Sequence, residues 1–259
     1  MLLSIITPTI NRVKLLKKNL RNLDSLYSSF KNFEWLIIVE KNDMKTINFL
    51  KKHKKKYLTV IVGKHESAEL AFERGIKKSK GKFINFHGDD DFFNIDYISC
   101  INKKLFTTKS KWIIFDGYYI DENFNIIRKL ITFIKSLLLR NYGLIDLNIV
   151  NYIMTPSVFV RKDTYKKIGG LGVIKRSGSD YILWMNLYKK YMPKIIKKKL
   201  TYAMITTGTI SGKFELEKYI FLYKKMQKNN KKGFLNSILI TASISLIIFY
   251  NYVTKKIIN

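Results

Sequence analysis

Four short apolar runs alternate with helical patterns in the first 86 residues, and this alternation restricts the fold more than any other feature. The runs are rich in β-branched residues and predict strands over residues 2–6, 35–39, 58–62 and 82–86. Apolar residues recur at helical spacing over residues 11–27, 46–54 and 66–80. We expect Asn11 to cap the first helix and Gly81 to end the third. Such alternation is typical of an α/β layer with a mainly parallel sheet.

Polar residues follow three of these predicted strands directly. They are Thr7-Pro8-Thr9, the segment 40–43, and the triplet Asp89-Asp90-Asp91. The carboxyl ends of parallel strands meet at one edge of a sheet, where ligands bind. Three adjacent carboxylates repel one another unless a cation shares their charge, and Mg²⁺ or Mn²⁺ prefers such oxygen ligands. Taken alone, the triplet also fits a solvated turn.

The charge of the chain suggests a negatively charged partner. Lys and Arg total 48 against 19 acids, which gives a formal net charge of +29. Nucleic acid and anionic lipid both fit this charge, but the lysines are spread throughout the chain rather than gathered in one segment. Cys100 is the only cysteine, so no intrachain disulfide can form, and we expect a buried structural thiol in a reducing compartment. His53, His65 and His87 show no metal-ligand spacing.

The second half begins with a predicted buried strand over residues 112–120. Residues 129–140 predict a helix with one apolar side, made by Leu130, Ile131, Ile134, Leu137 and Leu138. We expect this side to pack on the domain core, and a membrane interface is the alternative. A further helix is predicted over residues 181–191, with Asp180 at its start. Asp180 is either a reactive carboxylate in the favourable field of the helix or a simple N-cap.

The composition changes beyond Gly212. Residues 214–232 predict a strongly basic helix, and residues 234–253 are almost entirely apolar or small and polar. The second segment has about the ~20 residues of a bilayer span, but scattered Asn, Ser and Thr lower its hydrophobicity. We expect a helix that lies on or dips into the inner membrane leaflet, with a span and an ordinary packed helix as alternatives. No signal peptide opens the chain, which favours a cytoplasmic location on the inner face of the membrane.

Several segments, in order, resemble family 2 glycosyltransferases of the GT-A fold. Residues 4–12 resemble the opening strand of that family, and residues 75–84 the helix and strand before its metal motif. Gly88 and the three acids after it stand where the family carries Asp-x-Asp or Asp-Asp. Residues 155–162, 168–171 and 179–184 resemble the segments that precede and contain its catalytic carboxylate. The resemblance covers roughly residues 2–205. The sequence departs from it at Ile10, at Glu40-Lys41-Asn42 and at Glu73.

This resemblance implies an inverting, metal-dependent transferase of the bacterial surface-polysaccharide type. Asp180 would be the general base, and Asp91, with Asp89 or Asp90, would hold Mn²⁺ or Mg²⁺. The implied donor site consists of Thr7, Pro8, Thr9, Arg12, Glu40, Asp89 and Asp90. The donor would be a nucleotide sugar, with a UDP-sugar favoured, and the acceptor a hydroxyl of a lipid-linked or cell-surface glycan. An anionic inner-leaflet surface is a further expected partner, and nucleic acid is not.

The expected organisation is a GT-A domain over residues 1–212 and a helical extension over 213–259. Within the domain, residues 1–92 form the nucleotide-sugar half and residues 93–212 the acceptor half. One alternative function is a nucleotidyltransferase, but residues 7–12 are not the glycine-rich basic loop that such an enzyme needs. The others are a basic nucleic-acid-binding protein and a transferase relative that has lost activity.

Overall fold

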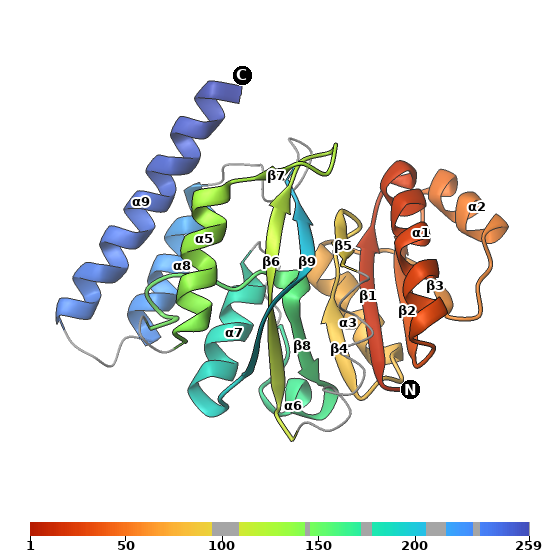
Figure 1. The fold of residues 1–259 in the computed structure, drawn as a ribbon, viewed down its shortest axis with the longest axis horizontal. Helices are drawn as coiled ribbons and strands as arrows, with labels where there is room; N and C mark the ends of the chain where they lie inside the picture. The colour runs from red at the N-terminus through yellow and green to blue at the C-terminus, as the bar shows by residue number, and fades with distance from the viewer. Residues whose placement is uncertain (95–108, 143–145, 172–177, 206–215, 230–233, 259) are drawn as a thin grey trace.

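The first half of the chain forms the parallel part of a single sheet. The computed structural model describes residues 1–94, 109–142, 146–171, 178–205, 216–229 and 234–258 (Figure 1). Strands β1 (Leu3–Thr9), β2 (Phe33–Glu40), β3 (Leu58–Gly63) and β4 (Phe83–Phe86) lie in the order β3-β2-β1-β4, all parallel. Helices α1 (Val13–Ser29), α2 (Met44–Lys52) and α3 (Ala68–Lys78) connect them. The predicted alternation of strands and helices is confirmed.

The second half continues the same sheet with mixed strand directions. Strand β8 (Val158–Arg161) runs antiparallel to β4 and is followed across the sheet by β6 (Trp112–Ile120), β9 (Lys194–Met204) and β5 (Asp91–Phe93). The short β7 (Ile126–Ile127) pairs with β6. The chain therefore passes from β4, in the centre of the sheet, to β5, at the end of the strand order, through only residues 87–90. This mixed, curled sheet matches the predicted fold class.

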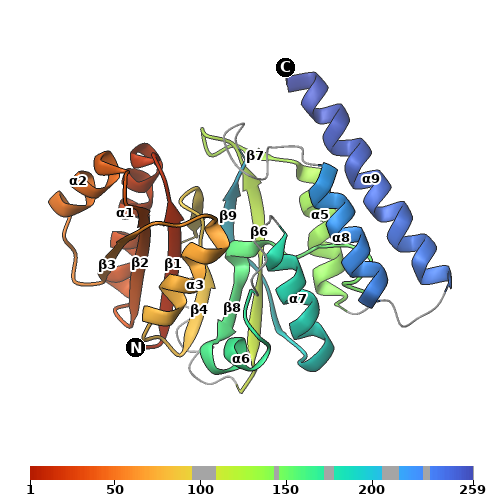
Figure 2. The same cartoon turned by 180° about the vertical axis from the view of Figure 1, so that it is seen from behind.

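Helices cover both faces of this sheet. Helices α1 and α2 pack on one face through a core that contains Leu16, Leu20 and Leu50 (Figure 1). Helices α3, α6 (Lys162–Lys167) and α7 (Ser179–Lys190) lie on the other face, as the view from behind shows (Figure 2). The short 3₁₀ helix η1 (Thr155–Ser157) leads into β8. The two ends of α3 are capped by Ser67 and Ser79, so the helix ends before Gly81, where it was predicted to stop.

The predicted cap of α1 is wrong. The N-cap is Arg12, and it makes no side-chain capping bond. Asn11 instead has a left-handed backbone, with φ of 56°. Its N–H donates to the Asp43 carboxylate at 2.6 Å, which ties the turn after β1 to the start of α2. Asn tolerates the left-handed region, so it serves this tight turn and leaves Arg12 at the helix start.

The predicted orientation of α5 (Lys129–Arg140) is also wrong, although the helix has the predicted bounds. Its buried residues are Thr132, Ser136 and Leu139. The Ser136 hydroxyl donates to Asp116 of β6 at 2.9 Å and accepts from Lys199 of β9 at 2.9 Å. This polar contact with the sheet sets the rotation of α5. Most of the leucine side of α5 consequently faces outward, and Leu130 is 72% exposed.

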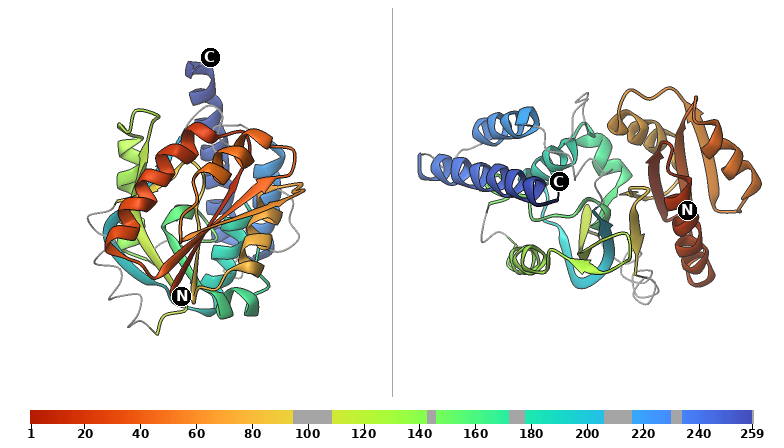
Figure 3. Two further views of the ribbon diagram at one scale, coloured as in Figure 1. Left: turned by 90° about the vertical axis from the view of Figure 1, so that its right-hand side faces the viewer. Right: turned by 90° about the horizontal axis from the view of Figure 1, so that it is seen from above.

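Two helices end the chain, α8 (Leu216–Asn229) and α9 (Phe234–Ile258), and they pack against each other beside α5 (Figure 3). Helix α9 buries Ile240 and Ile244, and the Ser243 hydroxyl donates to the Ile149 carbonyl at 2.5 Å. Among the described residues, no helix combines the length and apolarity that crossing a bilayer requires. The spanning alternative for residues 234–253 is therefore not supported, and contact with a membrane surface stays a prediction. Cys100 lies outside the described residues.

Gly81 tests the close contact between the residues just before β4 and the start of β1. Its N–H donates to the Ser4 hydroxyl at 2.8 Å, and a Cβ here would lie 2.5 Å from Ser4 N. We expect Gly81→Ala to lower the free energy of unfolding by about 1–3 kcal/mol, since rigid backbone must shift. Gly63→Ala is the control, because the atoms nearest its Cβ would belong to the Arg74 guanidinium, the end of a flexible side chain. Urea unfolding measures both, and equal losses would contradict the proposed close contact.

Candidate active site

Asp89 and Asp90 lie on the short turn that joins β4 to β5, and Asp91 is the first residue of β5; Gly88 and these three acids form the acidic turn. The Thr9 hydroxyl donates to one oxygen of Asp89 at 2.7 Å. Arg12 Nη1 donates to the other oxygen at 2.9 Å and to Asp90 at 3.0 Å. The Gly88 N–H donates to Asp91 Oδ2 at 2.7 Å. Polar groups from the end of β1 and the start of α1 therefore hold the acidic turn in place.

Helix α1 holds the same turn from its buried side. The Asn19 amide donates to the Asp89 carbonyl at 2.9 Å, and its oxygen lies 3.1 Å from His87 Nε2. One turn later, Asn22 bonds both to the N–H of Phe93, at 3.0 Å, and to its carbonyl, at 2.9 Å. The two asparagines are three positions apart and face the same side of the helix. The helix therefore fixes the backbone on both sides of the acids.

Burial gives this turn a high electrostatic cost. It raises the pKa of Asp89 to about 6; repulsion from Asp90 adds to the shift, and Arg12 opposes it. Burial also raises the pKa of Asp90. The pKa of Asp91 lies well above its usual range, through burial and then repulsion from Asp90. One arginine does not balance three carboxylates, so a further cation at this turn would be stabilised.

Gly88 permits the acids to converge. A Cβ at this position would lie 2.5 Å from Asp90 Oδ1 and 2.8 Å from Asp91 Oδ2. The two carboxylates therefore share a space that any other residue would fill. In the part of the chain that the structure describes, no group of three or more His, Cys, Asp or Glu side chains is arranged to hold a metal alone. Mg²⁺ is commonly held by one or two carboxylates together with substrate phosphates, and this pair fits that arrangement.

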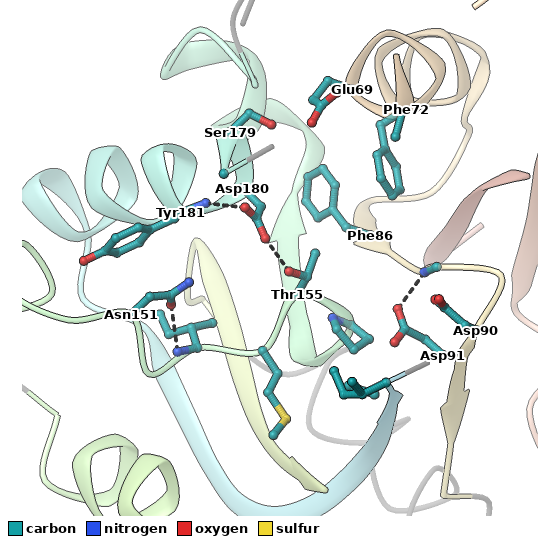
Figure 4. A pocket seen from close by; sticks show the side chains of 18 of the residues that line it. Glu69, Phe72, Phe86, Asp90, Asp91, Asn151, Thr155, Ser179, Asp180 and Tyr181 are labelled. Atoms are coloured by element: carbon teal, nitrogen blue, oxygen red, sulfur yellow. Dashed lines mark hydrogen bonds between the residues drawn. The ribbon is translucent and has the colours of Figure 1, made fainter. Parts of the chain in front are cut away.

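Asp180 lies in the first turn of α7, across the cleft from the acidic turn (Figure 4). Gly178, with φ of 100°, is the N-cap, so the simple N-cap interpretation of Asp180 is wrong. The Thr155 hydroxyl donates to Asp180 Oδ2, and the Tyr181 N–H donates to Oδ1 at 2.8 Å. These two donors fix the orientation of the carboxylate and leave lone pairs on both oxygens.

One cleft of about 1120 Å³ is lined both by the acidic turn and by Asp180. Pro8, Thr9, Arg12 and Glu40 line one part of it, beside the acidic turn. Glu40 accepts from the N–H of His65 at 2.8 Å, so it also anchors the loop after β3. The predicted residues of the donor site, except Thr7, therefore lie around a single space.

Thr7 does not lie in this cleft. It is fully buried, and its hydroxyl accepts from the Trp35 indole N–H at 2.8 Å. Side chains alternate along a strand, so Thr7 shares a face with Leu3 and Ile5, which pack against α1. The prediction that Thr7 lines the nucleoside pocket is therefore wrong.

Sequence reasoning missed two polar residues that face Asp180. Thr155 stands next to Pro156 in the segment 155–162, which resembles the family. This resemblance was a signal by which Thr155 could have been found. Glu69, in the first turn of α3, lies near Ser179 and Asp180 (Figure 4). Burial raises the pKa of Glu69, and repulsion from Asp180 adds to the shift. An acid at a helix start is ordinary in sequence, so nothing local marked it.

A model described as Glycosyl transferase family 2 matches residues 4–169. The chain belongs to this family. It is therefore a glycosyltransferase, and the nucleotidyltransferase and nucleic-acid-binding alternatives are not supported. The matched segment contains Pro8, Thr9, Glu40 and the acidic turn, and it ends before Asp180. No curated protein matches the chain.

Solved structures of glycosyltransferases share the fold of this family member. S. aureus TarS 1-349 in complex with UDP-GlcNAc has a TM-score of 0.69 at 15% identity, over 98% of this chain and 73% of that one. The mannosyltransferase PcManGT from Pyrobaculum calidifontis, in complex with GDP-Man and Mn²⁺, has a TM-score of 0.61 at 10% identity. That match covers 94% of this chain and 69% of the mannosyltransferase. At these identities the likeness concerns the fold alone.

The electrostatic cost of the acidic turn predicts a pH-dependent gain in stability for Asp90→Asn. The pKa of Asp89 is about 6 in the folded protein and about 3.9 in an unfolded chain. The folded state therefore binds more protons between these values, and the shift destabilises it increasingly as pH rises to about 6. Removing the Asp90 charge should stabilise the metal-free protein by about 1 kcal/mol at pH 7.5. The gain should vanish near pH 4.

Urea unfolding of both proteins in EDTA, from pH 4 to pH 8, measures this difference. Asp163→Asn is the control, because Asp163 lies outside the cleft and pairs with Arg161 at 2.8 Å. The Arg161 hydrogen bond lowers the pKa of Asp163 to about 2, so this substitution should destabilise at neutral pH. A gain for Asp90→Asn that is equal at pH 4 and pH 7.5 would contradict like-charge repulsion as its cause.

Proposed function

We propose that this chain transfers a sugar from a nucleotide-sugar donor to an acceptor hydroxyl, with inversion at the anomeric carbon. One observation supports this proposal above the others: the acidic turn and Asp180 come from separate elements and line the same cleft. A volume of about 1120 Å³ exceeds the range of about 300–1,000 Å³ typical of sites for one small ligand. The cleft has room for two substrates.

The donor occupies the part of the cleft beside β1 and β4. Pro8, Thr9 and Glu40 line the nucleoside side, next to the acids. Two structures with the same fold support a nucleotide sugar, since TarS was solved in complex with UDP-GlcNAc and the mannosyltransferase with GDP-Man. The higher similarity is to TarS, which favours a UDP-sugar for this chain.

A divalent cation, Mn²⁺ or Mg²⁺, would be held by Asp91 together with Asp89 or Asp90. Asp90 and Asp91 already share the space above Gly88, whereas both oxygens of Asp89 accept from Thr9 and Arg12. When bound, the ion supplies positive charge that stabilises the departing nucleoside diphosphate. The mannosyltransferase structure, a complex with GDP-Man and Mn²⁺, supports this assignment.

Asp180 is the general base of the proposed reaction. It takes the proton of the acceptor hydroxyl as the hydroxyl oxygen bonds to the anomeric carbon, and the bond from that carbon to the diphosphate breaks. Thr155 and the Tyr181 N–H keep the carboxylate oriented during this step. A single base on the side opposite the leaving group gives one displacement and therefore inversion.

The acceptor is a lipid-linked or cell-surface glycan, and the enzyme works at an anionic membrane surface. Leu130, Phe133 and Leu137 form an exposed apolar row on α5. The net charge of +29 adds electrostatic attraction to anionic lipid, at about 1 kcal/mol for each Lys or Arg near the surface. Exposed apolar side chains beside basic ones are typical of helices that lie in a membrane interface.

A thermal-shift panel of UDP, GDP and their sugar conjugates, each with and without Mn²⁺, tests the proposal. Binding to the folded state alone raises the melting temperature by mass action, by about 2.7 kcal/mol of stability at 100 times Kd. We expect a UDP-sugar with Mn²⁺ to give the largest shift. No shift from any nucleotide would refute donor binding and favour a relative that has lost activity.

Asp180→Asn should reduce turnover about 10²–10⁴-fold, because amide nitrogen and oxygen cannot accept the proton. Nucleotide affinity should stay close to that of the unchanged enzyme, since Asp180 lies on the other side of the cleft. Single-turnover assays give the rate, and calorimetric titration with UDP gives the affinity. Asp163→Asn, outside the cleft, is the matched control. Turnover equal to that of the unchanged enzyme would refute the assignment of the base.

Asp91→Ala should abolish the dependence of nucleotide binding on metal. Titrating UDP with and without Mn²⁺ measures this dependence without any turnover. The control is Asp121→Ala, a turn carboxylate that binds Asn123 and Asn125 and lies outside the cleft. If Asp91→Ala retains the full effect of Mn²⁺ on UDP affinity, Asp91 is not a ligand. The same titrations of Asp89→Ala and Asp90→Ala show which of these two carboxylates is also a metal ligand.

A further inference from the structure

The cleft continues beyond Asp180 into an apolar arm. Helices α5, α8 and α9 enclose this arm on the side of the molecule away from β1. Its walls include Ile131, Ile134, Leu138, Met226, Ile244 and Leu246. Ile134 is 46% exposed and Leu246 is 67% exposed, so the arm reaches solvent between α5 and α9. Nucleotide, sugar and metal are all polar, and none of them would use such walls.

Two cations line the same cleft, one just before α5 and one within it. The Lys135 ammonium donates to the Tyr119 hydroxyl at 2.8 Å and lies 5.4 Å from the centre of its ring. The Arg128 guanidinium approaches the same ring at 5.9 Å. All three side chains line the cleft. The lining therefore includes apolar helices, a cationic pair and the Asp180 region, a combination suited to a ligand with apolar, anionic and hydroxyl-bearing parts.

We propose that the apolar arm binds the hydrocarbon chain of the acceptor, with Arg128 and Lys135 binding a phosphate that joins this chain to the hydroxyl-bearing sugar or polyol. The proposal rests on the proposed function, because it places the acceptor hydroxyl at Asp180. It specifies the acceptor as a prenyl phosphate type of glycolipid. A free oligosaccharide or a protein would leave the arm without an occupant.

The outer face of α5 supports a hydrocarbon occupant. Leu130, Phe133 and Leu137 project from the helix away from its buried side, next to the opening that Ile134 lines. A chain anchored in a bilayer could enter the arm beside this apolar row without exposing its whole length to water. Each CH₂ group that the arm shields from water contributes about 0.8 kcal/mol.

Binding of geranyl phosphate tests the proposal directly, with geraniol and inorganic phosphate as its two separated parts. Geranyl phosphate is short enough to be used without detergent, and isothermal titration at pH 7.5 gives its affinity for the full chain. We expect geranyl phosphate to bind at least tenfold more tightly than geraniol and than phosphate. Equal affinity for geranyl phosphate and geraniol would overturn the phosphate site.

Variants of α5 provide a matched pair. Ile134→Asp places a charge in the arm and should weaken geranyl phosphate at least tenfold, whereas Leu130→Asp, on the same helix but outside the cleft, should not. Leu246→Asp repeats the test from α9, at an exposed site that tolerates a charge. Lys135→Gln should weaken geranyl phosphate but leave geraniol unchanged. Unchanged affinity for geranyl phosphate in both Ile134→Asp and Leu246→Asp would overturn the assignment of the arm.

Two further measurements separate the possible outcomes. UDP titration of the unchanged protein and of each variant reports on the donor site. If the unchanged protein binds no UDP, the proposed function is refuted. If it binds UDP but not geranyl phosphate, only the assignment of the arm is refuted. Sedimentation with phosphatidylglycerol vesicles reports on membrane contact. If Leu130→Asp abolishes vesicle binding while Ile134→Asp leaves geranyl phosphate binding intact, this face of α5 contacts a bilayer and does not hold an acceptor chain.

Discussion

The clamp on the acidic turn is the constraint on which the rest of the site depends. Residues 87–90 carry the chain from the centre of the sheet to its last strand, and together with Asp91, the first residue of that strand, they present the three acids. Thr9, Arg12 and Asn19 hold the turn with polar groups. The Thr9 and Arg12 bonds oppose the rise in the pKa of Asp89 that burial and repulsion from Asp90 cause. The negative charge that the proposed cation would balance thus follows from the way in which the sheet is closed.

Local sequence determined the elements, while long-range contacts determined their orientation. The strands of the first half and α7 were predictable, because apolar runs and helical spacing report on neighbouring residues. The rotation of α5 was not, because it depends on Ser136 meeting Asp116 and Lys199 from strands β6 and β9. The role of Asn19 was not predictable either, because its partner, the Asp89 carbonyl, lies 70 residues later in the chain.

The residues of the candidate site likewise divide into those that the local sequence predicts and those that depend on distant contacts. The acids could be predicted, since polar residues at strand ends meet at one edge of a sheet. Alternation along β1 then separates Thr7, which faces the core, from Pro8, which faces the cleft. The orientation of Asp180 required Thr155, 25 residues earlier in the chain. A pattern search can therefore find the proposed general base, but it cannot find the hydroxyl that orients its carboxylate.

The segment that matches the family model and the residues that follow it contribute different parts of the cleft. The matched residues, 4–169, contain the proposed donor side and α5, whereas Asp180, α8 and α9 follow them. Apolar side chains of α8 and α9 line the proposed acceptor arm together with Ile131, Ile134 and Leu138 of α5. The polar contact that sets the rotation of α5 thus also turns these three side chains toward the proposed acceptor side.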